Sequence, residues 1–83
     1  MRGKVVIINR LSGLFAVQLE DGDFAVLELL EGHTVEPNDF VQGNLDALGG
    51  EEVLNVTQQE RMSVYGQSGR CTLEAARALM HRR

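Results

Sequence analysis

Few side chains in this sequence could hold a metal ion. His33 stands near Glu31 and Glu36, so one imidazole and two carboxylates could in principle meet a cation. Cys71 and His81 do not have the spacing of zinc ligands, and the sequence offers no second ligand pair beside them. A histidine in an acidic connection is more often solvated than bound to metal. We therefore expect His33 to be an exposed loop residue and predict no metal site.

Residues for covalent or acid–base catalysis also lack suitable partners. Cys71 precedes a predicted helix, which leaves two interpretations open, a reactive thiol and a small buried residue. The carboxylate pairs Asp21/Asp23 and Glu51/Glu52 flank predicted turns, whereas acid–base catalysis needs carboxylates held in a dry pocket. We therefore expect a protein without catalysis and without a cofactor.

The length and composition describe one small folded domain. The chain has 83 residues, of which 43% are hydrophobic and 24% charged, values typical of a folded globule. No apolar run is long enough to cross a membrane, and the N-terminus lacks the pattern of a signal peptide. One cysteine allows no internal disulfide, which is typical of a reducing compartment. These features predict a cytoplasmic protein that does not bind membranes.

The net charge of -4 is unevenly distributed along the chain. Residues 1–10 carry three cations and no acid, and residues 61–83 carry five arginines and one acid. The stretch between them carries eleven acids and neither lysine nor arginine. We expect the basic chain ends to lie near this acidic middle in the fold. The acidic middle would also repel a polyanionic partner.

The elements that must position these residues are short strands followed by a helix. Asp21-Gly22 predicts a hairpin turn and Gly49-Gly50 a second turn. Thr72 is a good N-cap for a helix over residues 72–82, and its apolar stripe, Leu73, Ala76 and Met80, predicts docking on the sheet. Strands are predicted at 4–9, 14–20, 24–29, 40–45 and 52–57, with a weaker one at 61–67.

The second and third strands decide which side chains face outward. Alternation in the second strand places Phe15, Val17 and Leu19 inward, with Leu14 and Ala16 outward. The third strand allows two registers, which differ in whether Phe24 faces the core or the solvent. Closely spaced antiparallel strands favour a barrel, because closure removes exposed strand edges.

The first 29 residues resemble the cold-shock type of OB-fold. The resemblance rests on Gly3-Lys4-Val5 with Asn9, on the run from Ser12 to Val17, and on Glu20-Asp21-Gly22 followed by Phe24-Ala25-Val26-Leu27. It implies an OB-like barrel that binds single-stranded nucleic acid by stacking bases on outward aromatic side chains. The predicted fold is therefore all-β, a five- to six-stranded OB-like barrel (about 3–67) with one C-terminal α-helix (about 72–82) in a single domain of residues 1–83.

The residues at the family's binding positions favour a different partner. Aliphatic Ile7, Ile8, Leu14 and Ala16 stand where that family has aromatic side chains, and the acidic middle of the chain offers no basic groove. Our leading hypothesis is a protein-interaction or regulatory module that is a monomer or a weak dimer. Its candidate interaction surface consists of outward residues of the second and third strands: Leu14, Ala16, Gln18, Phe24 and Leu27.

The alternative hypothesis is a weak binder of single-stranded nucleic acid. It combines two aromatic rings with the basic residues of both chain ends. The candidate contacts are Arg2, Lys4, Arg10, Phe15, Phe24, Arg61 and Arg70.

Overall fold

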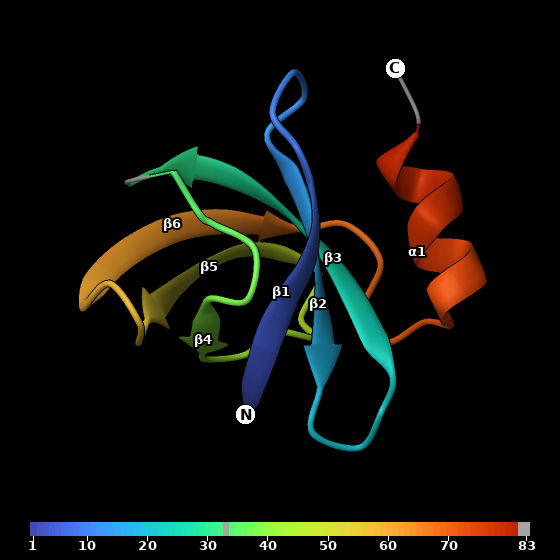
Figure 1. The fold of residues 1–83 in the computed structure, drawn as a ribbon, viewed down its shortest axis with the longest axis horizontal. Coiled ribbons are helices and arrows are strands. Elements are labelled where there is room, and N and C mark those ends of the chain that lie inside the picture. The colour runs from blue at the N-terminus through green and yellow to red at the C-terminus, as the bar shows by residue number, and fades with distance from the viewer. Residues whose placement is uncertain (33, 82–83) are drawn as a thin grey trace.

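The computed structural model describes residues 1–32 and 34–81, and within them the chain forms six strands and one helix (Figure 1). No helix in these two ranges is long and apolar enough to span a bilayer. The elements are β1 (Arg2–Asn9), β2 (Leu14–Leu19), β3 (Phe24–Glu31), β4 (Phe40–Gln42), β5 (Gly49–Asn55), β6 (Glu60–Gly66) and α1 (Leu73–Met80).

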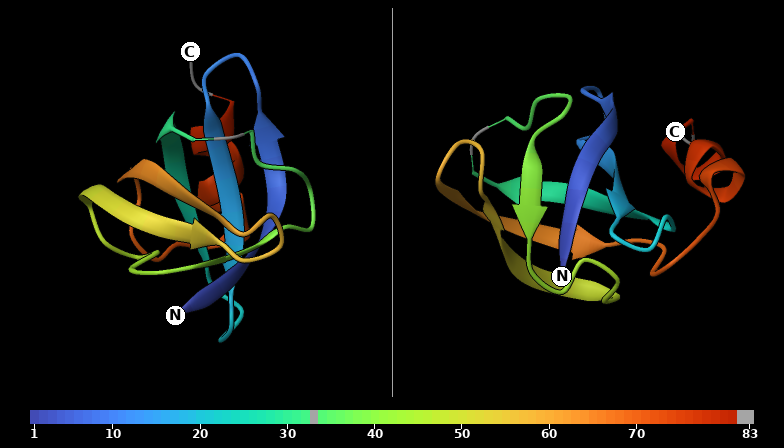
Figure 2. Two further views of the ribbon diagram at one scale, coloured as in Figure 1. Left: turned by 90° about the vertical axis from the view of Figure 1, so that its left-hand side faces the viewer. Right: turned by 60° about the horizontal axis from the view of Figure 1, so that its bottom comes forward.

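The strands close into a barrel in the order β1-β2-β3-β6-β5-β4, with β4 returning to β1. All neighbouring strands are antiparallel. The two views of Figure 2 show β5 and β6 on the side of the barrel opposite β1, and α1 outside the barrel beside β2 and β3. The predicted small all-β barrel with a C-terminal helix is confirmed.

The barrel interior contains the side chains that alternation in β2 predicted. Phe15 and Val17 are fully buried and Leu19 is 4% exposed. In β3 the register pairs Ala16 with Val26 and Gln18 with Phe24, which puts Phe24 on the outer face. Ala25 and Leu27 therefore point inward, where both are buried. The ambiguity of the third strand is resolved by this pairing.

The predicted fourth strand is shorter than its pattern suggested. β4 ends at Gln42, and residues 43–48 form a loop that contributes the fully buried Leu45 to the core. This loop crosses the end of β6 so closely that a Cβ at Gly66 would collide with the carbonyl oxygen of Ala47. Gly49-Gly50 belongs to β5, so the predicted turn at this position is wrong. The loop has already reversed the chain direction before these glycines.

Helix α1 forms as predicted and docks on the outer face of the barrel. Thr72 is its N-cap, and the Thr72 Oγ1 accepts a 3.1 Å hydrogen bond from the amide of Ala75. Ala76 and Met80 are buried against the outward residues Ala16 and Val26. The docking prediction is confirmed, although Leu79 packs on this cluster and Leu73 is only half-buried. The predicted helix end, residue 82, lies outside the described residues.

Hydrogen bonds hold the helix at both of its ends. Before α1, the main chain of Cys71 exchanges two 2.8 Å hydrogen bonds with that of Phe24. At its C-terminal end, the Asn9 Nδ2 donates to the carbonyl of Met80 at 2.9 Å. Helix α1 is therefore fixed over β1, β2 and β3, where it covers part of their outer face.

Candidate interaction surfaces

The predicted interaction surface on β2 and β3 is largely covered. Ala16 points outward as predicted, but α1 buries it completely. Leu14 and Phe24 are half-buried against the same cluster, and Gln18 stays exposed. Leu27 is 1% exposed inside the barrel, so its placement on the surface was wrong. Leu14, Ala16 and Phe24 of this surface pack with the docked helix, whereas Leu27 lies in the barrel core.

The two aromatic rings of the nucleic-acid hypothesis are not available for stacking. Phe15 lies in the barrel core with no exposed area. Phe24 faces outward but packs beside Cys71 under the start of α1. The structure corrects both expectations. Phe15 points into the barrel, and Phe24 points outward from its strand but is partly covered by the segment that begins α1.

Three of the arginines proposed for nucleic acid are paired with acids of the chain middle. Arg10 lies 3.1 Å from Glu36, and Arg61 lies 2.7 Å from Glu52. Arg70 contacts three aspartates, which are Asp21, Asp23 at 3.7 Å and Asp46 at 3.2 Å. The basic chain ends therefore pair with the acidic middle inside one molecule, and little charge is left at these positions to bind phosphate.

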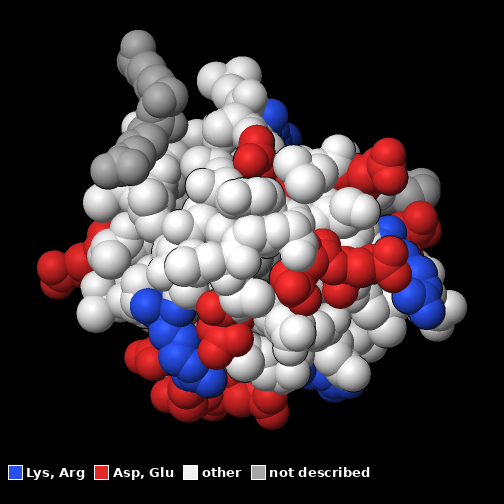
Figure 3. Space-filling model, turned by 180° about the vertical axis from the view of Figure 1, so that it is seen from behind, with Lys and Arg blue, Asp and Glu red and all other residues white. Residues whose placement is uncertain are grey.

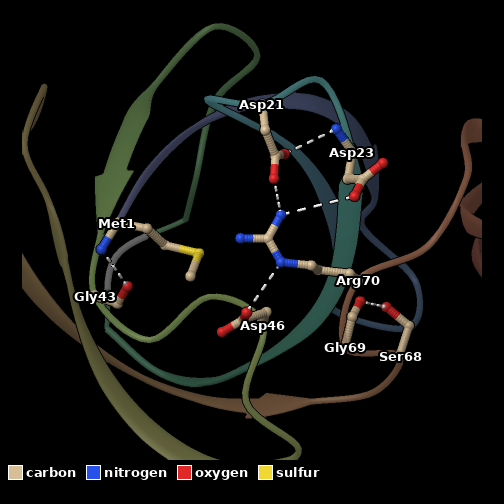
Figure 4. A network of polar contacts seen from close by, with 8 residues as sticks. All are labelled: Met1, Asp21, Asp23, Gly43, Asp46, Ser68, Gly69 and Arg70. Atoms are coloured by element: carbon tan, nitrogen blue, oxygen red, sulfur yellow. Dashed lines mark hydrogen bonds and ion pairs between the residues drawn. The ribbon is translucent and has the colours of Figure 1, made fainter.

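The Arg70 cluster has a structural role. Figure 4 shows its guanidinium between Asp21 and Asp23 of the β2–β3 turn and Asp46 of the loop before β5. The backbone amide of Asp23 and then Arg70 lower the pKa of Asp21, and the hydrogen bond to Asp21 raises the pKa of Arg70. The cluster joins two turns to the segment that leads into α1.

The candidate metal ligands and the Cys71 thiol can be located only within the described residues. No group of three His, Cys, Asp or Glu side chains within residues 1–32 and 34–81 could hold a metal ion. His33 lies outside the described residues. The thiol of Cys71 is half-buried, and its sulfur lies 3.6 Å from the hydroxyl of Ser68.

One basic corner keeps its charge. On β1 and β4, Lys4 pairs in register with Phe40, whose residue is 46% exposed, and Arg2 pairs with Gln42. The Arg2 guanidinium donates to the Gln42 side chain at 3.1 Å. Within the described residues, no ion pair joins Arg2 or Lys4 to an acid. We call Arg2, Lys4 and Phe40 the Phe40 corner.

The outer face of β3, β6 and β5 is open beside α1. Tyr65 is 47% exposed in β6, and its register neighbours are Glu28 on β3 and Gly50 on β5. A Cβ at Gly50 would have no described atom within 4 Å. Leu48, which lies next to Gly66, is 71% exposed. Figure 3 shows this side of the molecule with an uncharged middle and charged side chains of both signs around it. We call Leu48, Gly50 and Tyr65 the Tyr65 surface.

The barrel end at the β1–β2 hairpin is also apolar and open. Leu11, at the tip of the hairpin, is fully exposed. A cavity of about 220 Å³ opens beside the base of this hairpin, lined by Ile8, Leu29 and Val35 together with Asn9, Arg10, Gly13 and Thr34. We call Leu11 and this cavity the Leu11 end.

Sequence reasoning did not identify Tyr65, Leu48 or Leu11 as functional candidates. Alternation placed Tyr65 in a weak strand without saying which of its faces would stay open. The one available signal was that Leu11 is a large apolar residue within a predicted turn, where polar residues are usual.

The described residues form a small closed β-barrel with a docked C-terminal helix. Compared with known protein families, with curated proteins and with solved structures, the chain has no match.

Proposed function

We propose that this protein is a non-catalytic binding module of the OB type, located in the cytoplasm, whose partner is another protein. The observation that carries the proposal is the Tyr65 surface. A half-exposed tyrosine lies in the middle of a sheet face, beside the open backbone of Gly50 and near the exposed Leu48. Exposed tyrosines of this kind are enriched among the residues that dominate protein–protein binding.

The surroundings of Tyr65 indicate the chemistry of the partner. Glu28 is its neighbour on β3, and Glu52 lies one outward position further along β5, opposite Ser63. Glu28 accepts a 3.3 Å hydrogen bond from Gln67, and Glu52 is paired with Arg61. An uncharged centre whose rim carries Glu28 together with the ion pair of Glu52 and Arg61 fits a protein that inserts an apolar side chain and places polar or charged groups of both signs around it.

A photo-crosslinking amino acid at position 65 tests this function in the protein's native cells. We expect covalent adducts with a discrete protein when the probe replaces Tyr65. The matched control places the same probe at Glu74, which is exposed on α1, and should give no such adduct. Adducts mainly with nucleic acid, or equal adducts from both positions, would contradict the proposal.

Weak binding of single-stranded nucleic acid is a second candidate function, supported by the Phe40 corner. A half-exposed ring lies there beside two cations whose side chains form no ion pair within the described residues. The Glu20 carboxylate lines the same corner and accepts a 3.0 Å hydrogen bond from the Arg2 amide. A base could stack on Phe40 while a phosphate contacts Lys4 or Arg2. The acidic middle of the chain opposes such binding.

A fluorescence titration with pyrimidine-rich oligonucleotides separates the two candidates. If the protein-binding function is right, the oligonucleotides should show no saturable binding to the protein at physiological salt. If the second candidate is right, binding is micromolar and falls steeply with salt. In that case Phe40→Ala weakens it about tenfold, a loss at the lower end of the range for one stacked base. Tyr65→Ala is the control for this titration and should have no effect.

A further inference from the structure

The Leu11 end carries an apolar side chain that none of the described residues covers. Leu11 is 101% exposed at the tip of the β1–β2 hairpin, which projects from the barrel (Figure 1). A side chain this exposed buries no apolar area when its own chain folds, so it adds no hydrophobic stabilisation to the fold. Its burial would require another molecule.

The turn holds Leu11 in a defined outward position. The side chain of Asn9 accepts a 3.1 Å hydrogen bond from the amide of Leu11, and the Asn9 carbonyl accepts one of 2.9 Å from Gly13. Gly13 has a φ of 78°, which a glycine adopts without strain. Because the backbone of the hairpin tip is already ordered, little backbone conformational entropy is lost when Leu11 binds.

A cavity that could hold such a side chain lies at the same end of the barrel. The cavity beside the hairpin has a volume of about 220 Å³, and Ile8, Leu29 and Val35 form its apolar wall. A buried apolar cavity of about 150 Å³ is large enough to bind benzene. This cavity is open to solvent and can admit one leucine side chain.

The charges at this end are complementary as well. Arg10 lines the cavity and pairs with Glu36 at 3.1 Å in the free chain, with both side chains about half exposed. If a two-fold axis related two copies, Arg10 of each could pair with Glu36 of the other in place of its own Glu36, an exchange between exposed ion pairs that adds little net attraction. A knob, a cavity and both signs of charge on one end make this surface self-complementary.

We propose that two copies of this chain associate through the Leu11 end, each copy placing Leu11 in the cavity of the other. The inference goes beyond the proposed function and does not depend on the Tyr65 surface. The contact occupies one end of a molecule whose total surface is 4920 Å². We expect it to bury less than the roughly 800 Å² per partner of a standard stable interface, so the dimer should be weak and reversible.

Sedimentation equilibrium over a wide concentration range tests the proposal. We expect a monomer–dimer equilibrium, and Leu11→Ser should weaken it about a hundredfold, because one leucine contributes about tenfold and the symmetric contact contains two. Leu11 makes no buried contact in the monomer, so thermal unfolding of the dilute variant should match that of the wild type. The control is Leu54→Ser, which removes a 40% exposed leucine of β5 and should leave the dimer unchanged.

A second variant tests the cavity from the opposite side. Thr34 is exposed at the cavity wall, and Thr34→Phe should fill the cavity from within its own chain and prevent dimerisation. The proposal is overturned if Thr34→Phe dimerises normally, if the wild type shows no association, or if it grows beyond a dimer. It is also overturned if high salt dissociates the dimer, because that would indicate pairing by charge; an apolar contact should persist or strengthen.

Discussion

At the scale of single residues, Asp39 is the acid most closely surrounded by donors. It is 5% exposed, and its Oδ2 accepts hydrogen bonds from the Glu36 amide, the Asn55 Nδ2 and the Gln58 Nε2 at 2.9, 2.9 and 2.7 Å. Burial raises the pKa of Asp39, but these three bonds outweigh burial and lower it below its ordinary value of 3.8. Asp39 thus joins the β3–β4 connection to the β5–β6 turn.

Replacing Asp39 with asparagine should destabilise the protein. In Asp39→Asn the amide oxygen can still accept the three hydrogen bonds made to Oδ2, but it lacks the negative charge that strengthens them. The free energy of unfolding at neutral pH should therefore fall by about 2 kcal/mol. Urea denaturation measures this loss. Glu20→Gln, which changes an exposed carboxylate, is the matched control and should change the free energy by less than about 0.5 kcal/mol.

The lowered pKa also predicts a pH dependence. A carboxyl group whose pKa is lower in the folded state stabilises the fold above its unfolded value, here 3.8, and that contribution is lost as pH falls through the folded pKa. The wild type should therefore lose more stability on acidification through this interval than Asp39→Asn does. Equal losses for the two proteins would show that other carboxylates determine the acid sensitivity.

At the scale of elements, α1 and the outer face of β2 and β3 cover each other. The helix has eight residues, too few to be stable alone in water. Ala16 and Val26 would be exposed apolar surface without it. Each element therefore depends on the other for burial, and this explains why the predicted interaction surface is closed.

Met80→Ala should weaken this docking. Met80 is 2% exposed in the cluster formed with Ala16, Val26 and Ala76. Its truncation should lower the free energy of unfolding by about 2 kcal/mol, at the low end for buried methionine because a terminal helix can shift to fill the space. Arg77→Ala is the control, since Arg77 is exposed on the same helix. Equal thermal melts for the two variants would show that α1 does not contribute to stability through this cluster.

At the scale of the whole molecule, the buried residues form two clusters of different size. The larger fills the barrel and includes Phe15, Leu45 and Met62. The smaller lies between the outer face of the barrel and α1. Because the strands are joined into a closed ring while α1 packs on one face, the two parts should differ in local stability.

Hydrogen exchange of the native protein should resolve this difference. Amides of β2, which pair with both β1 and β3, should exchange only on global unfolding. Amides of α1 should exchange sooner, through opening that leaves the barrel intact. Arg70→Gln should speed exchange in α1 further, because it removes the contacts that hold the preceding segment to Asp21 and Asp46. Equal protection of β2 and α1 would mean that the chain unfolds as a single unit.

Local pattern was enough to predict several features of this protein. Alternation placed Phe15, Val17 and Leu19 in the core, because successive side chains of a strand point to opposite faces. Thr72 marked the start of α1, because an N-cap needs only its own side chain and the next turn. The uneven charge predicted that the chain ends would lie near the acidic middle, as the ion pairs of Arg10, Arg61 and Arg70 show.

Tertiary structure decided which of these residues are available for binding. The sequence predicted an outward Ala16 and an apolar stripe on the helix, but only packing brought the two together and closed that surface. The side of β3 that carries Leu27 followed from its register with β2, which no local pattern specifies. Tyr65 and Leu11 stay exposed because no distant element covers them within the described residues. Exposure depends on contacts between residues far apart in the chain, and only the three-dimensional fold sets those contacts.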